Sequence, residues 1–432
     1  MPLLQQFRFF RFILSTLTAN IAQNALLYTL LIVVIDETGS SIHTSIFVIC
    51  SLLPVIVLGL LAGVIVDYLP NKPILITANL ARAGGALLLL QAPTSVGAIY
   101  LFAMVMWTVQ QFSSPAATSA LPSIVARDRF NSGMALLNVT SLVAQLIGMV
   151  LFAPLVLKLV GGPEPVYLVS GILYAAAAYF IFSIPNLTDL VVKKEELLQE
   201  RTQPKFVEAL SAGWRMLRSD SIAFQAMVQF TLLEMATAIL IVLMPQYTED
   251  VIGTSAENLV YIFSPAALGL FLGLWSAQRL GKLFGNPATA RIGFALFVAA
   301  LGAFAVSGVI ANEIEENGFV PIEEIAAFFN IDFAVVVAML IAIPAGLGAG
   351  TVGVAARAIL LERAPVEGRG RIFATQSWMS GVLSLLPIFI AGALSTVIDV
   401  RITLFIVALS LAAAAIYARF GLKPPRPEAL AA

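Results

Sequence analysis

A single acidic side chain, Glu234, lies near the middle of the long apolar stretches of this sequence, in the run 222–242. A charge at the centre of a bilayer costs at least about 2.5 to 3.5 kcal/mol, so such residues usually face a cavity or a partner. Glu234 is therefore a candidate for proton coupling or substrate contact. The alternative is a permanently protonated acid that bonds a neighbouring helix. Gln225 and Gln229 do not share its face, being about 180° and 140° away around a helix.

The first apolar segment carries four polar residues within an arc of about 100°. They are Thr16, Asn20, Gln23 and Asn24. Such a face could line a water-filled pathway or bond a second helix. We favour the pathway, which makes Asn20, Gln23 and Asn24 cavity-lining candidates. Gln110 and Gln111, in the segment 96–118, are further candidates with a less regular pattern.

Arg82 stands about ten residues into the third apolar segment. It could form an intramembrane ion pair with Asp67 or Asp128, or extend its charged end to the inner membrane surface. We favour a structural pairing over substrate binding.

Three glycines in the segment 333–357 have the GxGxxG spacing of dinucleotide-binding loops: Gly348, Gly350 and Gly353. That motif needs a strand before it and a polar context after it, and the sequence provides neither. The glycines instead predict close helix packing between Gly346 and Gly353.

Composition indicates the elements that must position these residues. Hydrophobic residues make up 59% of the 432 residues and charged residues 11%, against about 25% charged in soluble proteins. The apolar runs are near twenty residues long, enough to cross a bilayer as helices. We predict twelve spans: 12–35, 43–66, 73–92, 96–118, 133–157, 165–185, 222–245, 257–277, 288–310, 333–357, 373–395 and 401–419.

Neither a soluble fold nor a cleaved signal peptide explains these apolar runs well. A soluble helical protein would show polar stripes with several charges per two turns, and 46–66 shows none. A signal peptide would be shorter than the first segment, which also contains three amides. The single cysteine, Cys50, excludes an intramolecular disulfide and a multi-cysteine metal site, and we expect no metal and no cofactor.

The basic residues predict the orientation, because Lys and Arg in short loops stay cytoplasmic. With both termini in the cytoplasm, every basic residue except Lys158, Arg401 and Arg82 falls on the cytoplasmic side or at its edge. Their spread over many loops also argues against a nucleic-acid site.

The charged connection near 185–221 divides the spans six and six. We predict an N-terminal bundle over 1–188, a cytoplasmic linker with an amphipathic helix over 189–220, and a C-terminal bundle over 221–432. Short echoes between the halves, such as 63–72 and 273–282, favour two pseudo-symmetric bundles, an architecture found in transporters.

Residues 36–83, with DETGSS and then GLLAGVIVDYLPNKPILITANLARA, resemble the major facilitator superfamily, especially its branch of macrolide-efflux proteins and the enterobactin exporter. In that branch a G-x-x-x-D-R-x-G-R-R/K signature joins spans two and three. The resemblance maps it onto Gly63, Asp67 and Lys72 and implies an inner-gate motif. Tyr68 and Asn71 are among the departures from it, which changes the expected charge network.

The stretches 121–148 and 367–374 are similar to the same branch, so the resemblance covers nearly the whole chain. It implies an all-α integral membrane protein with the major facilitator fold. It also implies a multi-pass protein of a bacterial cytoplasmic (inner) membrane, which we expect to be monomeric.

We therefore expect a secondary active transporter, not an enzyme, that exports an amphipathic or lipophilic small molecule such as a drug, macrolide or siderophore-like compound. Alternating access would be coupled to inward proton movement. A lysolipid or lipid translocator, or a uniporter of the same fold, is the alternative. A membrane enzyme would need clustered carboxylates for Mg²⁺, which the spans lack. No G-x-x-x-x-G-K-[ST] loop for ATP occurs.

Overall fold

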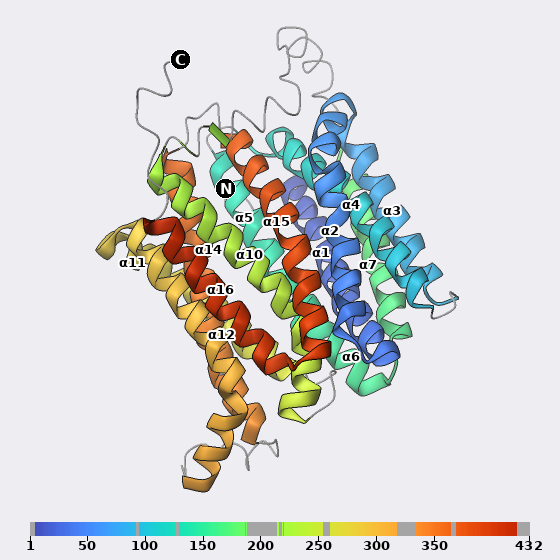
Figure 1. The fold of residues 1–432 in the computed structure, drawn as a ribbon. Coiled ribbons are helices and arrows are strands. Elements are labelled where there is room, and N and C mark those ends of the chain that lie inside the picture. Colours follow the sequence, from blue (N-terminus) through green and yellow to red (C-terminus); the bar gives the residue numbers. More distant parts are fainter. Residues whose placement is uncertain are drawn as a thin grey trace. The chain divides into compact units, whose positions relative to one another are not determined.

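The structure is a computed structural model that describes residues 5–91, 95–126, 129–185, 187, 214–215, 218, 220–253, 260–317, 333–363 and 369–420. Every regular element in these ranges is helical. In chain order the elements are α1 (Phe7–Thr38), α2 (Ser41–Tyr68), α3 (Asn71–Leu88), α4 (Val96–Ile124), α5 (Phe130–Gln145), η3 (Leu146–Phe152), α6 (Ala153–Val160), α7 (Glu164–Phe182), α10 (Ser221–Tyr247), η4 (Thr248–Ile252), α11 (Val260–Phe284), α12 (Asn286–Asn317), α14 (Phe333–Arg363), α15 (Arg369–Val397) and α16 (Val400–Phe420) (Figure 1).

Ten helical segments in the described part of the chain are long and apolar enough to cross a membrane. The other two predicted spans correspond to α3 and α11. Polar residues such as Lys72, Asn79 and Arg82 lower the apolar character of α3. The predicted all-α membrane fold is confirmed.

The outer surfaces of these helices are apolar, as a lipid solvent requires. Large side chains in the middle of helices, such as Ile172, Phe271, Leu386 and Leu409, are between 58% and 66% exposed. A water-soluble protein rarely exposes so many large apolar side chains. Contact with lipid hydrocarbon accounts for these residues.

The chain forms two compact units. The first contains Met1–Thr38 and Ile46–Pro204, and the second contains Gly39–Ser45 and Lys205–Ala432. Gly39 separates α1 from α2 with a φ of 58°, a left-handed conformation that glycine adopts without steric cost. The predicted linker 189–220 lies outside the described residues except for Trp214, Arg215, Arg218 and Asp220.

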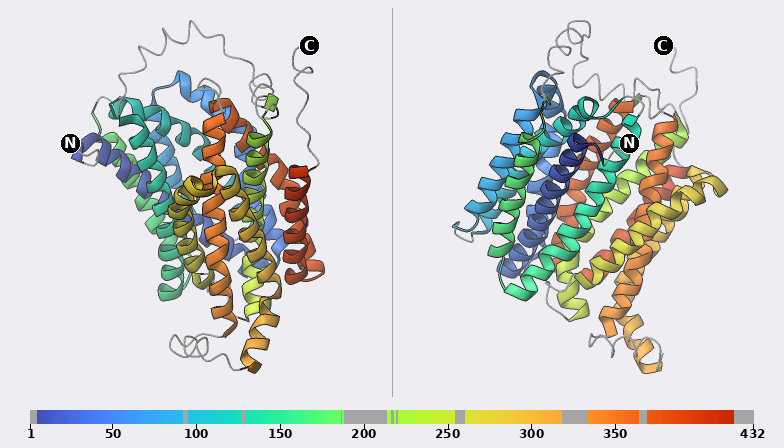
Figure 2. Two further views of the ribbon diagram at one scale, coloured as in Figure 1. Left: turned by 90° about the vertical axis from the view of Figure 1, so that its left-hand side faces the viewer. Right: turned by 180° about the vertical axis from the view of Figure 1, so that it is seen from behind.

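In the first unit, α7 packs along both α1 and α3, and α3 also packs against α4 (Figures 1 and 2). Their apolar faces meet in a core that includes Phe9, Phe12, Leu121 and Ile181. The π-helical segment η3 lies against α1, where a Cβ on Gly148 would overlap the Ile21 carbonyl oxygen. Only glycine permits this approach of the two backbones.

In the second unit, α14 packs closely along α11 and α12. A Cβ on Gly346 would overlap the carbonyl oxygen of Ala266, and one on Gly350 that of Leu270. Gly348 similarly abuts Gly293 of α12. The predicted packing role of this glycine run is therefore confirmed at these three positions, whereas Gly353 has open space around it.

The second unit also includes the first turn of α2. The Ser45 hydroxyl donates a hydrogen bond to the Ile388 carbonyl of α15 at 3.1 Å, and the Ser41 hydroxyl donates to the Gln246 amide oxygen of α10. Gly392 of α15 leaves room for these serines, because a Cβ there would overlap Ser45 Oγ.

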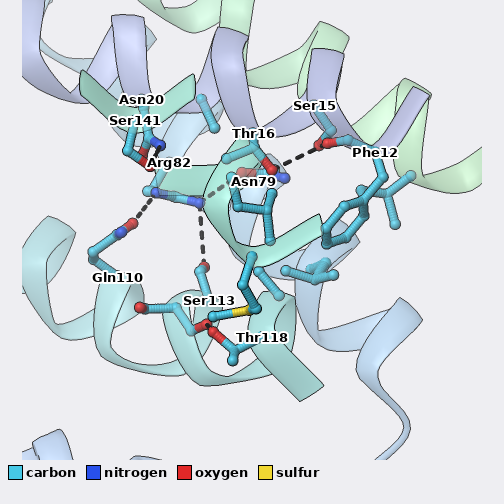
Figure 3. A pocket seen from close by; sticks show the side chains of 17 residues that line it. Phe12, Ser15, Thr16, Asn20, Asn79, Arg82, Gln110, Ser113, Thr118 and Ser141 are labelled. Carbon is cyan, nitrogen blue, oxygen red and sulfur yellow. Dashed lines mark hydrogen bonds between the residues drawn. The ribbon is translucent and has the colours of Figure 1, made fainter. Parts of the chain in front are cut away.

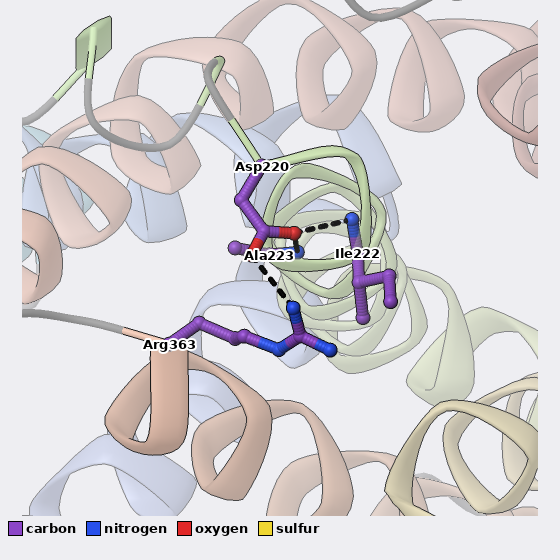
Figure 4. A network of polar contacts seen from close by, with 4 residues as sticks. All are labelled: Asp220, Ile222, Ala223 and Arg363. Carbon is purple, nitrogen blue, oxygen red and sulfur yellow. Dashed lines mark hydrogen bonds and ion pairs between the residues drawn. The ribbon is translucent and has the colours of Figure 1, made fainter.

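Asp220 caps the N-terminus of α10 (Figure 4). Its carboxylate accepts hydrogen bonds from the backbone N–H groups of Ile222 at 2.9 Å and Ala223 at 3.2 Å. Its second oxygen accepts from Arg363, at the end of α14, at 3.1 Å. The cap satisfies amide donors that would otherwise have no partner in the helix.

Candidate functional site

The first unit contains a polar pocket of about 200 Å³ between α1, α3, α4, α5 and α7 (Figure 3). Its wall combines one charged side chain, several amides and hydroxyls, and an apolar remainder. The lining residues are Phe12, Ser15, Thr16, Ala19, Asn20, Leu75, Asn79, Arg82, Gln110, Ser113, Ser114, Ala117, Thr118, Met134, Leu137, Ser141 and Ile181. A pocket with this mixture suits a ligand that has both a polar and an apolar part.

Arg82 is the centre of the polar wall, and its side chain is only 2% exposed. Its guanidinium donates hydrogen bonds to Asn79 Oδ1 at 2.6 Å, to Ser113 Oγ at 3.2 Å and to the Gln110 amide oxygen. Nε donates to the Ala78 carbonyl at 3.4 Å. A guanidinium does not lose its proton in proteins, so a full positive charge is buried here among neutral acceptors.

The aromatic ring of Tyr174, on α7, packs against the Arg82 guanidinium. The Arg82 guanidinium carbon lies 4.8 Å from the centre of the Tyr174 ring, a distance at which the ring attracts a cation. The Tyr174 hydroxyl donates to Gln23 Oε1 at 2.8 Å. Gln23 is thus joined to the Arg82 site through Tyr174 and does not itself line the pocket.

The other polar residues of α1 divide between two environments. Thr16 and Asn20 line the pocket, and Asn20 Nδ2 donates to Ser141 Oγ of α5 at 3.1 Å. Asn24 does not line it. Its amide donates to the Asn20 carbonyl at 2.8 Å, and its Cβ faces Gly148.

The two glutamines of α4 also lie in different surroundings. Gln110 lines the pocket and contacts Arg82, whereas Gln111 donates to the Trp107 carbonyl at 3.3 Å and is not part of the wall. Sequence reasoning missed Asn79 and Ser113. Each lies three residues from a predicted site residue, on the same helix face, which is the signal that could have identified them.

The proposed inner-gate motif is described only in part. Gly63 and Asp67 lie in α2, but their surroundings are outside the described residues, as is Asp128. The predicted pairing of Arg82 with one of these acids stays a prediction. Lys72 donates to the Ile184 carbonyl at 2.7 Å and lies 5.7 Å from the Phe182 ring centre, which ties the start of α3 to the end of α7.

Glu234 lies in the second unit, half-buried on α10. Its Oε2 accepts a hydrogen bond from Gln376 Nε2 of α15 at 2.9 Å. The same amide nitrogen donates to Ser380 Oγ at 3.0 Å, so both amide hydrogens have acceptors. Because Oε1 can carry a proton while Oε2 still accepts, this hydrogen bond is compatible with both protonation states of Glu234.

Gln225 and Gln229 are at a different place in the second unit. They line a separate, largely apolar pocket of about 410 Å³ between α10, α12 and α16, together with Arg291. This agrees with their predicted position on another face from Glu234. Among the described residues there is also no group of three His, Cys, Asp or Glu side chains that could hold a metal ion.

A helical membrane protein with a polar pocket inside one of its bundles has the general construction of a transporter. The model of the Major Facilitator Superfamily matches residues 12–334, well over half of the chain, and the chain belongs to that superfamily. A curated relative is macrolide efflux protein A of Streptococcus pyogenes, which is 24% identical over 315 residues, 71% of this chain and 72% of that protein.

Solved structures agree on the fold. A point mutant of the nucleoside transporter NupG superposes with a TM-score of 0.72 at 13% identity, covering 96% of this chain and 100% of that one. An inward-facing bacterial homologue of the iron transporter ferroportin gives 0.68 at 12% identity, covering 96% and 98%. A bacterial homologue of the human lysosomal transporter Spinster gives 0.62 at 12%, covering 97% of each chain.

Proposed function

We propose that this protein exports an amphipathic or lipophilic small molecule from the cytoplasm by alternating access, and that inward proton movement drives the export. The observation that carries the proposal is the pocket around Arg82. Its lining combines the hydrogen-bonding side chains around Arg82 with the apolar side chains of Phe12, Leu75 and Leu137. A molecule with a polar end and an apolar body fits this mixed lining.

Glu234 is the proposed coupling residue. It is a half-buried carboxylic acid within a membrane-spanning helix, held by one amide donor from α15. Intramembrane acids of this kind commonly serve as proton relays in transporters. Glu234 would take up a proton when the transporter opens to the outside and release it when the transporter opens to the cytoplasm. This cycle would link proton entry to substrate exit.

The direction of transport rests on the similarity to macrolide efflux protein A. For orientation, we propose that both termini are cytoplasmic, because this arrangement places nearly all Lys and Arg residues of the loops on the cytoplasmic side. We further propose a monomer in a bacterial cytoplasmic membrane. Protease protection of tags at the two ends, in oriented vesicles, would test the orientation.

Transport by the purified full-length chain in proteoliposomes tests the proposal. The probes are a macrolide, a lipophilic cation, an aromatic sulfonate and a lysophospholipid. We expect a proton gradient to move at least one probe against its own gradient, and a protonophore to abolish that movement.

Two results would contradict the proposal and favour its alternatives. Movement of every transported probe only down its own gradient, with no response to the protonophore, would indicate a uniporter. Movement of the lysophospholipid alone between leaflets would indicate a lipid translocator.

A further inference from the structure

The pocket of the first unit is built around a positive charge that no described side chain neutralises. The partners of the Arg82 guanidinium are a backbone carbonyl, two amide oxygens, a hydroxyl and an aromatic ring. These groups accept hydrogen bonds from four of its five N–H groups, and they leave a net charge at a site of low exposure. Burying a charge is costly unless it is paired, so an anionic ligand in the pocket would complete the site electrostatically.

Arg82 also determines whether the neighbouring amides offer hydrogen-bond donors or acceptors to a ligand. The amides of Asn79 and Gln110 turn their oxygens towards the guanidinium. Their NH₂ groups therefore point away from Arg82, and among the described residues neither NH₂ group has an acceptor. Because Arg82 occupies the amide oxygens of Asn79 and Gln110, these two side chains are left to act as hydrogen-bond donors through their NH₂ groups.

Two hydroxyls add to this set of donors. Ser141 Oγ accepts from Asn20, which leaves its own hydrogen to donate, and Ser114 is a second pocket hydroxyl. Within the described ranges, neither hydroxyl donates to a protein acceptor. The wall therefore presents N–H and O–H groups near a buried cation, which suits ligand oxygens that carry negative charge.

We infer that this pocket binds the oxyanion of an anionic amphipath, a carboxylate, sulfonate or phosphate. The apolar body of the ligand would pack against Phe12, Leu137 and Ile181, which line the same cavity. The inference rests on the proposed function, because it names the substrate class of the proposed export site. It also distinguishes this pocket from one that selects cationic drugs.

Binding of three probes with one ring system tests the inference. The probes are 2-naphthalenesulfonate, 2-naphthylmethanol and 2-naphthylmethylammonium, titrated by calorimetry into the full-length chain in nanodiscs. We expect the sulfonate to bind about tenfold more tightly than the alcohol and the ammonium probe to bind most weakly. Equal affinities, or a preference for the ammonium probe, would overturn the inference.

A nearly isosteric variant separates binding from folding. Gln110→Glu places a carboxylate beside the Arg82 guanidinium and hardly changes the volume of the side chain at position 110. The folded protein should therefore retain or gain thermal stability. We expect the tenfold preference for the sulfonate to disappear. Gln225→Glu makes the same charge change in the other unit and should keep the preference. A stable Gln110→Glu variant with an unchanged preference would show that Arg82 is only structural.

Flux measurements with the same probes distinguish this inference from the proposed function. Proton-driven transport of a neutral or cationic probe, without an anion preference in binding, would overturn the anion site and leave the transport proposal standing. An anion preference abolished by Gln110→Glu, without flux of any probe, would support the anion site and contradict the transport proposal.

Discussion

Gln376 Nε2 donates a hydrogen bond to Glu234 Oε2 at 2.9 Å and joins α15 to the only acidic residue near the middle of α10. Gln376 is itself 2% exposed and is oriented by Ser380 one turn along α15. The position of the acid is therefore fixed by a neighbouring helix, which is what a proton-transfer group needs for reproducible geometry.

Replacement of Gln376 by leucine should impair transport. Leucine is similar in size but cannot donate, so Glu234 loses its fixed position. We expect the rate of proton-driven flux to fall about tenfold, which corresponds to about 1.4 kcal/mol in the barrier. Gln225→Leu makes the same change away from Glu234 and should have little effect on that rate. An unchanged rate in Gln376→Leu would show that this contact is dispensable.

Tyr174 has two separable contributions, which thermal unfolding in detergent can resolve. Tyr174→Phe removes the hydroxyl that donates to Gln23 and keeps the ring beside Arg82, so it should cost about 1 kcal/mol. Tyr174→Leu also removes the ring and leaves a cavity, so it should cost about 3 kcal/mol or more. If the two variants unfolded at the same temperature, the ring would contribute nothing to holding the buried cation.

The glycines of α14 provide a matched pair. Gly346→Ala forces a methyl group onto the Ala266 carbonyl, and overpacking of this kind costs about 1 to 3 kcal/mol. Gly353→Ala meets open space and should be neutral or stabilising by up to about 1 kcal/mol, since alanine favours helix. The denaturant midpoint of each variant is the measurement. Similar midpoints for the two would contradict the close packing of α11 against α14.

The cap at the start of α10 should depend more on hydrogen bonding than on charge. Asp220→Asn can still accept from Ile222 and Ala223 and loses only the ion pair with Arg363. Because the two side chains are 29% and 47% exposed, that loss should be below about 1 kcal/mol and should shrink in high salt.

Asp220→Ala loses the cap as well, a further cost of about 1 kcal/mol that salt should not change. Thermal unfolding at low and high ionic strength measures both contributions. Equal destabilisation by the two Asp220 variants would show that charge dominates.

Much of the fold follows from the sequence, because a bilayer requires apolar runs of a set length. The predicted span 43–66, for example, corresponds to α2 at Ser41–Tyr68. The π-helical segment Leu146–Phe152 was not predicted. Apolar content does not distinguish an α-helical turn from a wider one, and the close contact of Gly148 with α1 is a tertiary feature.

The site was predictable only as a set of polar residues. Helical periodicity placed Asn20, Gln23 and Asn24 on one arc, but it could not say which neighbour each would meet. The structure puts Asn20 in the pocket, Gln23 on Tyr174 and Asn24 beside Gly148. The surroundings of Arg82 depend on how α3 packs against α4 and α7, which local sequence does not encode.

Proton flux is the most direct test of the central claim that Glu234 couples protons to transport. The interior pH of proteoliposomes is followed with a trapped dye while a transported probe is added, for the wild type, Glu234→Gln and Glu362→Gln. Glu362 is an exposed acid at the end of α14 that accepts from Asn286, so Glu362→Gln controls for loss of a carboxylate. We predict that probe-dependent proton flux persists in the wild type and in Glu362→Gln and is lost in Glu234→Gln. Equal proton flux in all three proteins would contradict the claim and place coupling elsewhere in the chain.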